Sequence, residues 1–141
     1  MEVSEKRAAR QPVRGRWFVW FAFLILWSVA LLMPNPIDPF NRYVLGGREL
    51  SHEITFLMAK SLHVCAYAAA AILTGWLRVP GPRRWWLLAF WSFHAAATEV
   101  GQLFVPGRTG SIRDVALDHL GLLIGLAISW RWWRSKPEEK W

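Results

Sequence analysis

Four long apolar segments, separated by short polar connections, dominate the pattern along the chain. The first covers residues 17–33 and contains no charged side chain, and the others cover about residues 54–77, 85–105 and 112–133. At a rise of ~1.5 Å per residue, each helix would cover most or all of a hydrocarbon core roughly 30 Å thick. The pattern therefore predicts an all-α polytopic membrane protein, a bundle of four transmembrane helices.

The connections between these segments contain the residues that end helices. Prolines and a glycine mark all three connections: Pro34, Pro36, Pro39, Pro80, Pro82, Pro106 and Gly107. The first segment also fits a signal peptide, but it is longer than the usual apolar region of ~7–15 residues, so a retained helix is predicted. The chain then divides into a basic tail over 1–16, one transmembrane domain over 17–133 and a second tail over 134–141.

The distribution of Lys and Arg predicts the orientation of the bundle. Twelve of these residues lie in the two tails and the middle connection, and four lie in the first and third connections. Cytoplasmic segments carry the excess of positive charge, so both termini are expected in the cytoplasm. The first and third connections then face outward.

Composition agrees with a membrane protein rather than with a nucleic-acid-binding one. Hydrophobic residues make up 54% of the chain, and eleven tryptophans suit membrane–water interfaces. The net charge of +7 is explained by basic residues that flank the apolar segments and contact anionic lipid, so no nucleic-acid partner is expected. Cys65 is the only cysteine, which excludes an intrachain disulfide.

Ionisable side chains inside the apolar segments require an explanation, because each costs ~2.5–3.5 kcal/mol at the centre of a membrane helix. The spacing of Lys60, His63 and Tyr67 places them on one helical face. Lys60, Glu99 and Asp118 each lie six residues from the outer end of a segment, which predicts a layer ~9 Å deep. This layer is either a polar pocket or a buried ion cluster that fixes helix register, and Lys60 alternatively extends its ammonium to the surface.

Other polar positions have simpler structural interpretations. Ser111 and Asp114 fit a capping box at the start of the fourth helix, and His94 is expected to bond a neighbouring helix. Gly121 and Gly125 have the spacing of a close helix contact. Arg108 suits a carboxylate or a phosphate at the outer head groups. His63, Glu99, Asp118 and His119 offer only a weak metal signal, so no metal and no cofactor are predicted.

Together, these positions resemble the VanZ-like family of small bacterial membrane proteins, one branch of which is associated with resistance to the glycopeptide teicoplanin. The resemblance runs from Lys60 to Gly125 and rests on ordered motif positions: Lys60, His63, Tyr67, Glu99, Gln102, Pro106, Gly107, Arg108, Ser111, Asp114, Gly121 and Gly125. It departs from many relatives at Ala59, where an acidic residue is common, and at Asp118, where asparagine is common. We therefore hypothesise that Asp118 is the counter-ion of Lys60.

Two functions follow from these observations. In the first, an outward-facing polar pocket binds or acts on an anionic, lipid-linked cell-envelope molecule or a glycopeptide antibiotic. In the second, the chain is a non-enzymatic subunit of a larger membrane complex or a homo-oligomer, and the cluster serves only helix packing. Glu99, His63 and Lys60 are candidates for any catalysis, and the pocket is assigned to Lys60, His63, Tyr67, Glu99, Gln102, Arg108, Ser111, Asp114 and Asp118.

Overall fold

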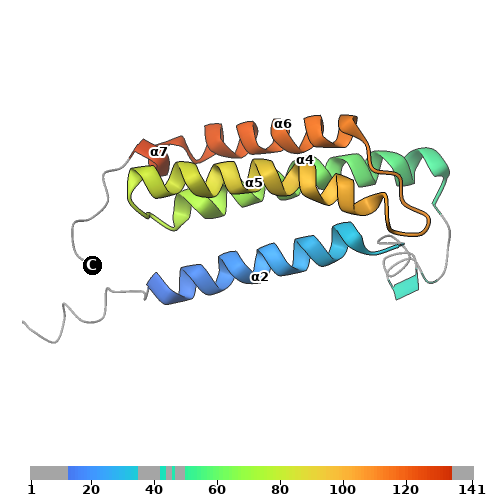
Figure 1. The fold of residues 1–141 in the computed structure, drawn as a ribbon, viewed down its shortest axis with the longest axis horizontal. Helices are drawn as coiled ribbons and strands as arrows, with labels where there is room; N and C mark the ends of the chain where they lie inside the picture. The colour runs from blue at the N-terminus through green and yellow to red at the C-terminus, as the bar shows by residue number, and fades with distance from the viewer. Residues whose placement is uncertain (1–12, 35–41, 44–45, 47–49, 135–141) are drawn as a thin grey trace, which may run out of the picture.

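The computed structural model describes residues 13–34, 42–43, 46 and 50–134, and this part of the chain is all-helical (Figure 1). Its helices, in chain order, are α2 (Val13–Leu32), α4 (His52–Trp76), α5 (Gly81–Gln102), α6 (Ile112–Ile128) and α7 (Trp130–Arg134). The residues 1–12 and 135–141 of the predicted tails lie outside the described part. The all-helical prediction is confirmed for the part described.

The four predicted segments differ from the helices in extent: α2 begins at Val13 rather than at residue 17, and α4 runs over His52–Trp76 rather than 54–77. α5 begins at Gly81 rather than at residue 85, because Pro82 occupies the first turn, where a proline has no helical hydrogen bond to lose. It ends at Gln102, before the predicted end at residue 105. The fourth segment divides into α6 and α7 at Ser129.

Side-chain contacts establish the directions of the four long helices. Lys60 pairs with Asp114 and His63 with Asp118, so α4 and α6 run parallel. Trp20 of α2 donates a hydrogen bond to Thr74, near the end of α4, so these two helices run in opposite directions. Ser92 and Glu99 of α5 contact His119 and Ser111, respectively, so α5 runs opposite to α6. The helices thus alternate in direction along the chain, and the start of α2 lies at the same end of the bundle as α7 (Figure 1).

Two glycines bring α6 into close contact with α4. A Cβ atom on Gly121 would lie 2.4 Å from the carbonyl oxygen of Val64, and one on Gly125 would lie 2.1 Å from that of Ala68. Both distances are too short for any side chain, so this approach requires glycine at both positions. The predicted packing role of Gly121 and Gly125 is confirmed.

The bundle has an apolar exterior, and its interior combines an apolar core around Tyr67 and Trp91 with a group of buried polar side chains. Large apolar side chains on the outside include Leu26, Phe93 and Leu123, each more than 60% exposed. His63, Glu99 and Asp118 are buried. An apolar exterior together with buried charged groups suits a lipid environment, in which charged side chains face the bundle interior. By length and hydropathy, α4 and residues Arg14–Leu32 of α2 are the described helices able to cross a membrane.

Candidate functional site: a polar network between three helices

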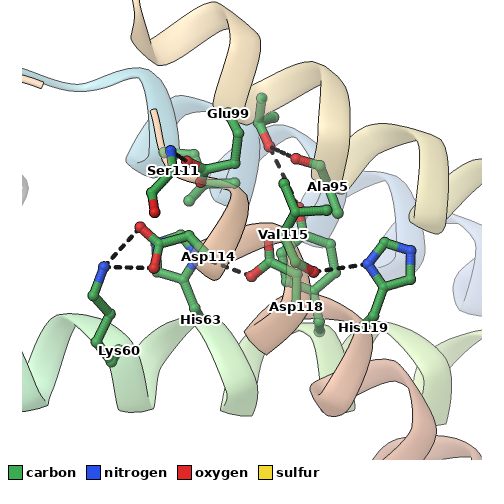
Figure 2. Close-up of polar contacts among 12 residues, drawn as sticks. Lys60, His63, Ala95, Glu99, Ser111, Asp114, Val115, Asp118 and His119 are labelled. Atoms are coloured by element: carbon green, nitrogen blue, oxygen red, sulfur yellow. Dashed lines mark hydrogen bonds and ion pairs between the residues drawn. The ribbon is translucent and has the colours of Figure 1, made fainter. Parts of the chain in front are cut away.

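The outermost contact of the network joins α4 to the first turn of α6. The Lys60 ammonium donates to both carboxylate oxygens of Asp114, at 2.5 Å and 2.7 Å (Figure 2). The Asp114 side chain is almost fully buried, whereas 27% of the Lys60 side chain is exposed. Lys60 is therefore the cation of the network that a molecule outside the bundle can reach.

One turn deeper, a histidine and an aspartate form a second pair. His63 Nδ1 donates to Asp118 Oδ1 at 2.8 Å, and the ring of Trp27 packs edge-on against the His63 ring. Asp118 is completely buried, and its Oδ2 has no hydrogen-bond partner. The Nε2 atom of His63 also has no partner among the described residues. This free nitrogen is available as a proton acceptor or as a metal ligand.

Glu99 of α5 occupies the position that a capping box would give to Asp114. Its Oε2 accepts the backbone N–H of Ser111 at 2.8 Å, and its Oε1 accepts from the Gln102 amide at 3.1 Å. Ser111 caps α6 as predicted, with its hydroxyl accepting from the backbone N–H of Arg113. The predicted role of Asp114 in this box is wrong, because its carboxylate binds Lys60 instead.

A hydrogen-bonded chain crosses the bundle beneath the two acid–base pairs. The Ser28 hydroxyl donates to the Leu24 carbonyl, so it accepts from His94 Nε2 at 2.9 Å. His94 Nδ1 then accepts from the Tyr67 hydroxyl at 3.0 Å. His94 therefore links α2 to α4, which confirms its predicted helix-to-helix bonding. Sequence reasoning missed Ser28, although it is the only hydroxyl residue in the first apolar segment.

Arg108 connects the loop before α6 to the end of α2. Its guanidinium donates to the Leu31 carbonyl, one of the last in that helix, at 3.3 Å. A cation suits this position because helix ends carry unpaired carbonyl groups and a partial negative charge. The Nε atom of Arg108 is buried without a partner. Arg108 thus holds α2 in place and retains one unused donor.

The predicted Lys60–Glu99–Asp118 layer is wrong in its pairing. Asp114 is the counter-ion of Lys60, and Asp118 lies one turn deeper against His63. The prediction measured depth from the end of each segment, but Lys60 lies eight residues inside α4 and Asp114 two residues inside α6. Because α4 extends beyond the start of α6 at this end of the bundle, equal distances from the helix ends do not give equal levels along the bundle.

His119 does not join this network. Its Nδ1 donates to the Val115 carbonyl and its Nε2 accepts from the Ser92 hydroxyl, at 2.7 Å and 2.6 Å. Adjacent residues on a helix point about 100° apart, so Asp118 and His119 meet different neighbours. The four-residue metal set considered from the sequence is therefore not brought together. A different set, His63, Glu99 and Asp114, has ligand atoms within 4.8 Å of one another.

Comparison with protein families assigns the chain to a class. A sequence model of the VanZ/LLP1 family matches residues 16–134, which include every helix of the bundle except the first three residues of α2. The chain belongs to the VanZ/LLP1 family. Comparison with curated proteins and with solved structures gives no match.

Proposed function

We propose that this VanZ-like protein crosses the bacterial inner membrane four times, with both termini in the cytoplasm. The alternating helix directions support this topology, because the start of α2 and the end of α7 lie at one end of the bundle. Described basic residues gather at the helix termini of that end, as the positive-inside rule requires for a cytoplasmic side: Arg14, Arg16, Arg83, Arg84, Arg131 and Arg134. The network around Lys60 then opens toward the outer leaflet.

Cysteine labelling tests this topology. In a Cys65→Ala background, Thr109→Cys is expected to react with a membrane-impermeant maleimide in intact spheroplasts, because Thr109 is exposed in the third connection. Arg134→Cys is expected to react only after the membrane is permeabilised. Labelling of both positions from outside, or of Arg134→Cys alone, would contradict the topology.

At the outward end, we further propose that the network binds an anionic, lipid-linked cell-envelope molecule, such as a polyprenyl phosphate. The main support for this binding is that the Lys60 side chain is partly exposed at the edge of an otherwise buried polar network. Arg108, which is partly exposed, contributes a second cation at the same end. Two cations suit a phosphate at head-group level, and the apolar outer faces of the helices suit its lipid chain. Like a polyprenyl phosphate, an acylated glycopeptide antibiotic combines a polar head with a lipid chain.

Lipid analysis of the purified protein tests this binding. Arg108→Ala is expected to lower the polyprenyl phosphate recovered per mole of protein by about tenfold, since a bond to a charged group contributes about 1.5–3 kcal/mol. Arg134→Ala removes the same charge at the opposite end and is expected to leave recovery unchanged. Equal recovery from all three proteins by mass spectrometry would refute lipid binding at Arg108. Recovery of added teicoplanin instead would identify the glycopeptide as the ligand.

The second candidate function is structural. It is favoured by the internal partners that the network already has: Lys60 with Asp114, Glu99 with Ser111 and Arg108 with Leu31. In that case the network orders the helices, and the protein acts by docking onto another membrane protein or a second copy. Cross-linking in native membranes distinguishes the two, because a single reproducible cross-linked partner favours docking and a lone species favours the binding site.

A further inference from the structure

We propose that His63, Glu99 and Asp114 form a binding site for one divalent transition-metal ion. The three side chains come from α4, α5 and α6, all three are buried, and each offers a ligand atom within 4.8 Å of the others. Figure 2 shows these side chains together beside Lys60, between the three helices. Ligand atoms about 2.1 Å from a tetrahedral metal lie about 3.4 Å from one another. Side-chain shifts of about an ångström would therefore bring the three ligand atoms to metal-binding distances.

The orientation of His63 is that of a metal ligand. Its Nδ1–H donates to Asp118, which leaves the lone pair of Nε2 free in a side chain that is only 6% exposed. Histidines that bind metals through one ring nitrogen usually donate the other N–H to a carboxylate or a carbonyl. Asp118 supplies that carboxylate here. With a metal bound, His63 serves as a ligand rather than as an acid–base group.

The charges around the site also favour a cation. Glu99, Asp114 and Asp118 contribute three carboxylates, and Lys60 is the only lysine or arginine paired with any of them within the described part of the chain. All three carboxylates are buried, where uncompensated charge is costly. A divalent ion would compensate the charge of the carboxylates that Lys60 does not neutralise. The Lys60 ammonium could stay in place, because each carboxylate oxygen has a second lone pair for the metal.

The ligand types indicate which ions fit. One imidazole nitrogen with two carboxylate oxygens suits Zn²⁺, Mn²⁺, Fe²⁺ or Co²⁺, whereas Mg²⁺ and Ca²⁺ prefer oxygen alone. The protein ligands number three, so the ion retains an open position, which an anionic oxygen can occupy. Binding of an anionic oxygen at the open position rests on the proposed lipid-binding function, but binding of the ion itself does not.

Titration with Co²⁺ alone tests the site, since its visible absorption reports nitrogen and oxygen ligands. The full-length protein, purified in detergent and stripped with a chelator, is expected to bind one equivalent of Co²⁺ and to show absorption between about 500 and 650 nm, with Zn²⁺ displacing it. Glu99→Gln retains an amide oxygen for the Ser111 N–H and is expected to weaken binding at least tenfold. His63→Gln is expected to abolish it. His119→Gln, a matched histidine change outside the cluster, is expected to bind as the unchanged protein does.

Two results would overturn the proposal. One is the absence of a saturable Co²⁺ equivalent in the unchanged protein. The other is equal affinity in Glu99→Gln and the unchanged protein, with both folded by circular dichroism. Lipid content measured on the same samples separates the two proposals. Protein that retains polyprenyl phosphate but binds no Co²⁺ refutes the metal site alone, and protein that binds Co²⁺ but retains no polyprenyl phosphate refutes lipid binding alone.

Discussion

Replacing Gly125 with alanine is expected to lower the free energy of unfolding by about 3 kcal/mol, at the upper end of the usual cost of overpacking a core. The added Cβ would lie 2.1 Å from the carbonyl oxygen of Ala68 and 2.8 Å from its Cα. Both atoms belong to the backbone of α4, so no side-chain rotation relieves the clash. The two helices must separate, which also moves Asp118 away from His63.

A second glycine provides the matched control for this change. Gly15 lies in α2, where an added Cβ would meet nothing within 4 Å, so Gly15→Ala is expected to be neutral or slightly stabilising, as alanine favours helix over glycine. Thermal or denaturant unfolding of both variants in detergent measures the difference. Equal stability of Gly125→Ala and Gly15→Ala would show that α4 and α6 are not packed this closely.

Removing the charge of Lys60 is expected to have a comparably large effect. Lys60→Met leaves the buried Asp114 carboxylate without its partner, and breaking a buried pair costs about 3–5 kcal/mol. The lower end of that range, about 3 kcal/mol, is expected because more than a quarter of the Lys60 side chain is exposed. Unfolding of the purified variant in detergent measures this loss.

Removing both partners is expected to restore most of the stability. In Lys60→Met/Asp114→Leu no buried charge remains unpaired, and apolar replacements of buried ion pairs are often neutral or stabilising. A small loss of about 0.3–1 kcal/mol is expected because Asp114 also suits the positive end of α6. If the double variant were as unstable as Lys60→Met alone, Asp114 would not be the partner on which Lys60 depends.

Much of the fold follows from local properties of the sequence. Ser111 before an apolar run predicts a helix start, and the Gly121–Gly125 spacing predicts a close contact, because both depend on residues within one turn. The shared face of Lys60, His63 and Tyr67 is predictable for the same reason. The structure confirms each of these predictions at the level of individual side chains.

The pairing within the site depends on how far each helix extends, which a single sequence does not specify. Lys60 meets Asp114 rather than Asp118 because α4 projects beyond the start of α6. Glu99 reaches the Ser111 N–H because Gly110 packs directly on its backbone; a Cβ there would lie 2.1 Å from the Glu99 carbonyl oxygen. The set of His63, Glu99 and Asp114 likewise comes from three helices, so no spacing along one helix reveals it.

In the proposed function, the network around Lys60 binds an anionic lipid-linked molecule in addition to holding the helices together. Polyprenyl phosphate recovered with the Lys60→Met/Asp114→Leu variant tests it most directly, because this variant removes the accessible cation and is expected to remain folded. We expect a stable protein with bound polyprenyl phosphate reduced about tenfold or more. A stable double variant that retains as much polyprenyl phosphate as the unchanged protein would contradict it.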